Sequence, residues 1–195
     1  MQFRPTKPTT AGISAIKTEP AIIVLSKSAL GIEYTAHRDR QTLLSDFKLA
    51  LEALTEIYAP VSAVRLGLRY VNVITRERVG ADMKRPLAWT DLLTPKFAAV
   101  PGGLIEIDDE TVFLSEISSP YGRGSMTVRY GILRDAADKT RHFRLDTDRF
   151  LDGAFQTAEV LDLLDGFSYD IFQVFSTVAG ESLLEWMRLE GSPSS

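Results

Sequence analysis

One alternating stretch, residues 64–74, constrains the fold more than any other part of the sequence. Its even-numbered positions are nearly all apolar, whereas its odd-numbered positions begin with two arginines and end with two valines. Successive side chains of a strand point to opposite faces, so the pattern predicts a strand with one face against a core and Arg65 and Arg69 on the other. These arginines would lie about 13 Å apart, with the bare Gly67 between them. The spacing suits an anion or the carboxylates of a partner, and it also suits acids on neighbouring strands, which we favour.

Helical periodicity occurs on both sides of this strand. The first helix is predicted from Arg40 to Tyr58, with Asp39 as its N-cap. The second is predicted from about Ala158 to Leu189 and would span roughly 48 Å. Gly166 and Gly180 are the positions at which this long helix would bend or break.

Several other segments have strand character and are separated by short polar turns. They are residues 21–35, which are typical of a hairpin, and residues 104–117, 125–133 and 141–150. Consecutive strands joined by tight turns form an antiparallel meander. The stretch 75–103 has no regular pattern apart from a short amphipathic piece at 87–93, which is predicted to form one or two helical turns. So long a loop is either functional or partly disordered. The fold class is therefore α+β: a twisted antiparallel sheet of about five to seven strands with two helices packed on one face, the C-terminal helix long.

The length of 195 residues predicts one domain of ordinary size. Residues 1–20 are rich in threonine and proline, which indicates an extended arm or edge. Residues 21–190 are predicted to form a single α+β domain, and residues 191–195 a flexible tail.

Composition excludes several classes of protein. The absence of cysteine excludes disulfides, thiolate zinc sites and cysteine nucleophiles, and it suits a cytoplasmic location. The net charge of −4 does not support binding of nucleic acid by bulk electrostatics. The longest apolar runs, such as residues 21–25, are far too short to span a membrane, so no membrane partner is expected.

The sequence shows no recognisable catalytic or metal-binding constellation. His37 and His142 are the only histidines, and neither has a second ligand at metal spacing, so we predict no metal and no cofactor. No serine lies in a G-x-S-x-G elbow, and the glycine-rich turns do not lead into helices as phosphate loops do. The sequence therefore favours a non-enzymatic protein over an enzyme.

Two carboxylates on one predicted strand have alternative explanations. Asp146 and Asp148 would lie about 7 Å apart on the same face. That spacing would serve a divalent ion or an acid/base pair, and it equally suits ion pairs with Arg65 and Arg69. We favour the ion pairs, because no third ligand is evident.

Three segments together resemble the signature of a sporadically distributed bacterial family of uncharacterised proteins. They are the motif Arg-Leu-Gly-Leu-Arg-Tyr-Val-Asn at 65–72, the strand Phe-Arg-Leu-Asp-Thr-Asp at 143–148, and the closing helix with Phe175 and Trp186. The resemblance covers about residues 20–189. It implies no activity, catalytic residue or cofactor. It does imply an additional N-terminal strand and helix in family members, so this chain would be a short form or a truncated product. The scattered distribution points to mobile or defence-associated gene neighbourhoods.

Three functions are consistent with these observations. The leading hypothesis is a non-enzymatic interaction or assembly module of a bacterial accessory or defence-associated system, whose partner is another protein or a second copy of the chain. The alternative is a sensor domain that binds a small anionic ligand or nucleotide in a pocket between the sheet and the long helix. The third is a hydrolase or nuclease using Asp146 and Asp148. No catalytic residue is assigned; the candidate ligand- or partner-binding residues are Arg65, Arg69, Tyr70 and Asn72.

Overall fold

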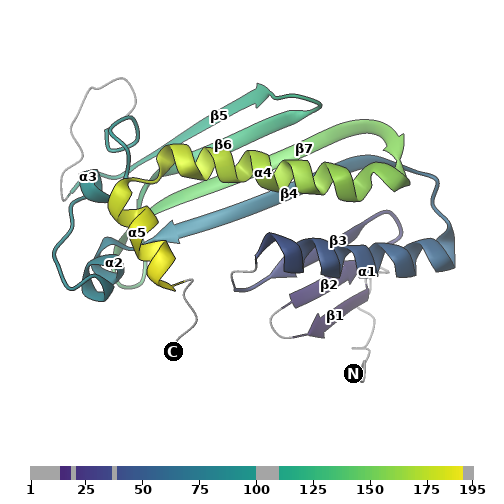
Figure 1. Ribbon diagram of the computed structural model, residues 1–195, viewed down its shortest axis with the longest axis horizontal. Helices are drawn as coiled ribbons and strands as arrows, with labels where there is room; N and C mark the ends of the chain where they lie inside the picture. The colour runs from purple at the N-terminus through teal and green to yellow at the C-terminus, as the bar shows by residue number, and fades with distance from the viewer. Residues whose placement is uncertain (1–13, 19–20, 37–38, 100–109, 191–195) are drawn as a thin grey trace. The chain divides into compact units, whose positions relative to one another are not determined.

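The computed structural model describes residues 14–18, 21–36, 39–99 and 110–190 (Figure 1). The chain divides into two compact units. Unit 1 contains the described residues up to Val64 together with Gly153–Asp165, and unit 2 contains Arg65–Asp152 and the described residues from Gly166 onward. The boundaries fall inside secondary-structure elements, so the two units are described in turn.

Unit 1 contains a three-stranded antiparallel sheet. Its strands are β1 (Ser14–Thr18), β2 (Ala21–Leu25) and β3 (Leu30–Tyr34), in the order β1-β2-β3. The predicted hairpin is confirmed: β2 and β3 pair antiparallel, with Ile23 opposite Ile32.

Helix α1 (Arg40–Tyr58) has the bounds that the sequence predicts. The Asp39 carboxylate caps it, accepting a 2.9 Å hydrogen bond from the backbone N–H of Thr42. The Tyr34 hydroxyl donates to Asp46 at 2.8 Å and ties α1 to β3. A 3₁₀ turn at Thr157–Glu159 completes unit 1, and its Thr157 hydroxyl donates to the Pro60 carbonyl.

A four-stranded sheet forms the centre of unit 2. Its strands are β4 (Ser62–Ile74), β5 (Phe113–Pro120), β6 (Ser125–Arg134) and β7 (Arg141–Gln156), in the order β4-β7-β6-β5. The predicted meander is confirmed, because β5, β6 and β7 pair antiparallel in succession. The predicted start of a strand at Leu104 lies outside the described residues. The prediction of one sheet of five to seven strands is wrong: β1–β3 form their own sheet, and the larger sheet has four strands.

The described chain has five α-helices, whereas the sequence predicts two long helices and one or two helical turns at 87–93. Besides α1 they are α2 (Arg76–Asp82), α3 (Trp89–Leu92), α4 (Val160–Val178) and α5 (Glu181–Glu190). The described part of the stretch 75–103 is therefore not an irregular loop, and Val79, Trp89 and Leu92 are buried in the core. The helical turns predicted at 87–93 are confirmed by α3. Helix α2 was not predicted, because its two turns present too few residues for the 3.6-residue periodicity to be recognised.

The long helix predicted at 158–189 is two helices separated at Ala179 and Gly180, so the break predicted at Gly180 is confirmed, whereas α4 continues through Gly166. The backbone N–H of Gly180 donates to the Leu92 carbonyl at 2.7 Å, and Thr94 N–H donates to the Val178 carbonyl at 2.9 Å. These bonds satisfy backbone groups that the interrupted helix leaves without intrahelical partners. A Cβ at Gly180 would lie 2.9 Å from the Asp91 carbonyl oxygen, so only glycine permits this close approach.

The two faces of the four-stranded sheet differ. One face, called the covered face, packs against α4 and α5 (Figure 1). Its core joins Ile132, Phe143 and Leu145 of the sheet to Phe175 and Leu183 of the helices. The opposite face, called the open face, carries the odd-numbered side chains of β4 and β6 and the even-numbered side chains of β5 and β7. No described helix of unit 2 packs on it.

Candidate functional site

The alternation predicted for β4 is confirmed for most of its length. Leu66, Leu68 and Ile74 are buried, whereas the arginines and valines of the open face are exposed. Val64 is the exception on the apolar side, because 72% of its surface is exposed. Arg65 and Arg69 therefore lie on the open face, about half exposed, as the sequence predicts.

Arg69 belongs to a cluster around a buried carboxylate. Its Nε and Nη2 donate to the two oxygens of Asp146 at 2.7 and 2.6 Å, and Arg144 Nη2 donates to Asp146 at 2.9 Å. The Asp146 side chain is only 1% exposed, although it lies on the open face. The hydrogen bonds from Arg69 hold the pKa of Asp146 below its ordinary value, against the opposing effect of burial, and they raise the pKa of Arg69. The predicted pairing of Arg69 with Asp146 is confirmed.

Arg65 has a different partner from the one predicted. Its Nη1 donates to Asp152 at 2.6 Å, and its guanidinium lies 4.6 Å from the centroid of the Phe150 ring. Asp148 instead lies beside Gly67. The physical reason is the antiparallel register: Arg65 precedes Arg69 by four residues, so its neighbours on β7 follow Asp146 by about four residues, not two.

Tyr70 and Asn72 do not join the two arginines. They alternate with Arg69 along β4, so their side chains point to the covered face, where both are partly buried. The four predicted site residues are thus divided between the two faces of the sheet, and Arg65 and Arg69 point away from α4.

The remaining strands add residues to the open face that the sequence reasoning missed. Arg129 Nε donates to Glu116 at 2.5 Å across β6 and β5, and Arg129 lies opposite Asp146 in the register. Arg144 lies opposite Gly131, which in turn lies opposite Leu114. Period-two alternation could have placed these residues on a strand face, but only the register shows which strands are neighbours.

The open face has a charged half and an apolar half. The charged half contains the ion pairs just described. The apolar half contains Val71 and Val73 of β4 and Leu114 of β5, which are 48%, 58% and 60% exposed, and Leu133 of β6, which is partly buried. Arg144 and His142 of β7 lie between the two valines and the two leucines, so the apolar side chains form two groups and not one continuous patch. Exposed valine and leucine side chains on a sheet face are surfaces that gain from association with another protein.

The covered face holds a buried arginine that the sequence did not reveal. Arg149 is 3% exposed, and its Nε donates to Asp170 of α4 at 2.9 Å. Its remaining nitrogens donate to the carbonyls of Arg123, Ser125 and Phe150. The guanidinium also lies 4.4 Å from the centroid of the Phe167 ring. These contacts make it a structural residue that joins the β5–β6 turn to α4.

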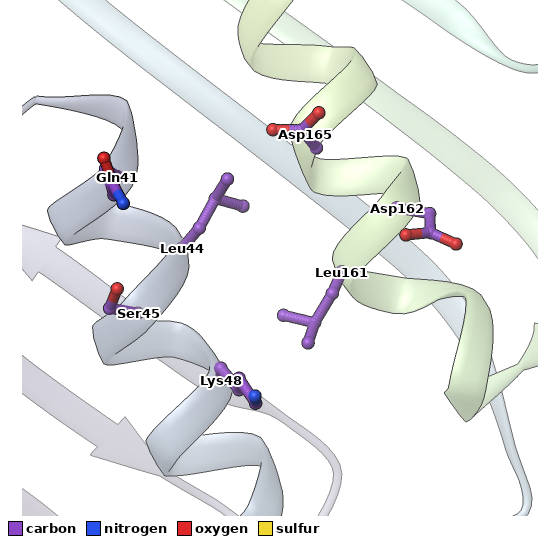
Figure 2. A pocket seen from close by; sticks show the side chains of 7 residues that line it. All are labelled: Gln41, Leu44, Ser45, Lys48, Leu161, Asp162 and Asp165. Atoms are coloured by element: carbon purple, nitrogen blue, oxygen red, sulfur yellow. The ribbon is translucent and has the colours of Figure 1, made fainter.

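Unit 1 has one open hollow, of about 270 Å³, among its described residues (Figure 2). It is lined by Gln41, Leu44, Ser45, Lys48, Leu161, Asp162 and Asp165, which extend from α1 and from the first turns of α4. Arg40 at its rim pairs with Asp165, and Lys48 lies 3.8 Å from Glu52. Two of the charged side chains that line the hollow, Lys48 and Asp165, therefore already have partners.

Within the described ranges, no three histidine, aspartate or glutamate side chains gather as metal ligands would. In the same ranges, no helix is both long and apolar enough to cross a membrane. Searches against protein-family models, curated proteins and solved structures find no match to this chain. The candidate site is accordingly defined by geometry alone: it is the open face of the four-stranded sheet.

Proposed function

We propose that this chain is a non-enzymatic assembly module whose copies associate through the four-stranded sheet of unit 2. One observation carries the proposal: Val71, Val73 and Leu114 are about half exposed or more on a sheet face that no described helix of unit 2 covers. A half-exposed valine or leucine gains free energy when a partner removes its surface from water.

The charges of the open face favour a second copy as the partner. The face carries Arg65, Arg69, Arg129 and Arg144 against Glu116, Asp146, Asp148 and Asp152. Four positive and four negative charges sum to zero, so the face has no net field that would attract a polyanion or a strongly basic partner. A second copy offers the same balance of charges and the same apolar half.

The proposed setting is a bacterial accessory or defence-associated system. Its support is the resemblance of the strand motif at 65–72, the strand at 143–148 and the closing helix to a scattered bacterial family.

The sensor alternative draws less support from the geometry. Arg65 and Arg69 already bind carboxylates of β7, and both lie on the face opposite to α4. A small anion would have to displace Asp152 or Asp146 from them. The hydrolase alternative is weakened similarly, because both oxygens of Asp146 accept hydrogen bonds from arginines and are not available to a metal or a water.

Sedimentation equilibrium of the full chain from micromolar to millimolar concentration tests the proposal. We expect reversible self-association that the double variant Val71→Lys, Val73→Lys weakens at least tenfold, because two lysines on each copy remove apolar contact and add repulsion. Leu49→Lys is the matched control, since Leu49 is 66% exposed and lies on α1 of unit 1, outside the sheet of unit 2 in the fold. A chain that stays monomeric throughout, or association that Leu49→Lys weakens equally, would contradict the proposal.

A further inference from the structure

The two edges of the four-stranded sheet are not equivalent. In the described chain β4 and β5 each have a strand neighbour on one side only. β5 has eight residues, contains Ser115, Ser118 and Ser119, and ends at Pro120, which lacks a backbone N–H. β4 has thirteen residues, no proline, and β-branched residues in its exposed half. A long edge of this kind presents backbone donors and acceptors to another strand.

We infer that two copies of this chain pair their β4 strands edge to edge, antiparallel about a two-fold axis at Leu68, so that two four-stranded sheets become one. The inference rests on the proposed self-association and assigns it a strand and a register. In this pairing Val71 and Val73, which lie on the edge strand β4, come to lie beside the second copy, whereas Leu114 lies on the far edge strand β5 and does not take part.

The length of β4 favours this register. Leu68 is the central residue of Ser62–Ile74, so an axis at Leu68 pairs every residue of β4, with Ser62 opposite Ile74 of the second copy. Any other centre leaves residues at one end unpaired and loses backbone hydrogen bonds. An axis perpendicular to the sheet also keeps the covered faces of both copies on one side, as the burial of Leu66 and Leu68 requires.

The arginines exclude the neighbouring registers. An axis at Gly67 would put Arg65 of each copy opposite Arg69 of the other. An axis at Arg69 would put the two Arg69 side chains opposite each other. Like charges directly opposite on one face are destabilising. The axis at Leu68 instead places Arg69 opposite Gly67 and Arg65 opposite Val71.

Gly67 leaves space for the Arg69 side chain of the second copy, and Asp148 beside it offers an opposite charge. A Cβ at Gly67 would lie 3.9 Å from Asp148 Oδ1 and 3.7 Å from the nearest atom, Phe150 Cβ. Among the described residues no hydrogen bond or ion pair joins Asp148 to another side chain, although its charge helps to raise the pKa of Arg69 in the same chain. In the pairing about Leu68, Arg69 of the second copy thus meets a bare glycine and a carboxylate instead of another cation.

Substitutions at Gly67 that differ in the sign of their charge test the proposed register of the β4 pairing. The nearest atoms lie at ordinary van der Waals distance, so Gly67→Ala fits the protomer. We expect Gly67→Lys to raise the dimer dissociation constant about tenfold, because it opposes Arg69 twice, once at each end of the two-fold pair. Gly67→Ala and Gly67→Glu should stay within about threefold of the unmodified chain, since neither adds a like charge opposite Arg69. Sedimentation equilibrium measures all three, and equal weakening by lysine and glutamate would overturn the register.

Disulfide formation gives a second test that does not depend on Gly67. The chain has no cysteine, so single-cysteine variants report only the intended contact. Residues 65 and 71 face each other in the proposed register, at a separation that a disulfide spans. We expect a mixture of the Arg65→Cys and Val71→Cys variants to form a cross-linked heterodimer under mild oxidation, identified by its mass.

The outcomes separate this inference from the proposed function. Val71→Cys alone should not cross-link, because the two residues at position 71 lie six positions apart in the register. Reversible dimers that resist Gly67→Lys, or efficient cross-linking of Val71→Cys to itself, would overturn the β4 pairing while self-association stands. A chain that is monomeric at every concentration would overturn both.

Discussion

The two faces of the four-stranded sheet bury opposite members of an arginine–carboxylate pair. Each face has an arginine–carboxylate pair built on β7. On the covered face the arginine is buried: the Arg149 side chain is 4% exposed and its partner Asp170 is 23% exposed. On the open face the carboxylate is buried: the Asp146 side chain is 1% exposed and its partner Arg69 is 52% exposed.

The difference follows from which groups are available to satisfy each charge. A guanidinium has five N–H donors, and on the covered face Asp170 and three backbone carbonyls accept from Arg149. A carboxylate needs fewer partners, and on the open face Arg69 and Arg144 supply them while their stems cover Asp146. An arginine can thus be a core residue where a turn supplies carbonyls, whereas an exposed face keeps its cations at the surface.

The largest expected effect is on the covered face. Arg149→Ala should lower the free energy of unfolding by about 3–5 kcal/mol, because it removes one partner of a buried pair and leaves three carbonyls without a donor. Arg65→Ala is the matched control on the open face. Its pair with Asp152 is more than half exposed on both sides, so the loss should stay below about 1 kcal/mol. Urea unfolding at neutral pH measures both, and similar losses would show that the faces do not differ.

A smaller effect is expected for the buried carboxylate of the open face. Asp146→Asn should lower the free energy of unfolding by about 2 kcal/mol, since it weakens charge-assisted hydrogen bonds from two arginines that can still reach water. Asp148→Asn, on the same strand face, should change it by less than about 0.5 kcal/mol. The same urea titrations apply, and a larger loss for Asp148→Asn would reverse the assignment of the buried charge.

The smallest expected effect is on the pH dependence of the difference in unfolding free energy between the unmodified chain and Asp146→Asn. Because the folded state lowers the pKa of Asp146, its stabilising contribution is complete above the unfolded-state pKa of about 3.9 and is lost as the pH falls through the lowered value. The difference in unfolding free energy between the unmodified chain and Asp146→Asn should therefore be constant at neutral pH and shrink below about pH 4. A difference that grows on acidification would contradict the sign of the pKa change.

Local patterns were sufficient to predict several elements. The bounds of α1, the hairpin of β2 and β3, the meander and the alternation of β4 could be predicted because each depends on neighbours within a few residues. Asp39 was recognisable as a cap for the same reason. The short helix α3 lies within the helical turns predicted at 87–93, whereas α2 was missed, since its hydrophobic contacts come from distant parts of unit 2.

The candidate site was only partly predictable. The position of Arg65 and Arg69 on one face followed from alternation, and so did the expectation that they pair with Asp146 and Asp148, which holds for Arg69 and Asp146. Asp152 as the partner of Arg65, and Arg129 and Glu116 as a further pair, depend on the register between strands, which no single strand encodes.

What the sequence by itself determined is the local geometry: where strands alternate, where α1 begins, and that β4 carries two arginines on one side. What only the tertiary structure decided is how those elements meet. It divided the strands into two sheets, and of the two predicted positions it broke the last helix at Gly180 and not at Gly166, because Leu92 and Thr94 supply hydrogen bonds around Gly180. It also buried Arg149 on one face and Asp146 on the other. These outcomes depend on contacts between residues far apart in the chain, and such contacts leave no periodic signal in the sequence.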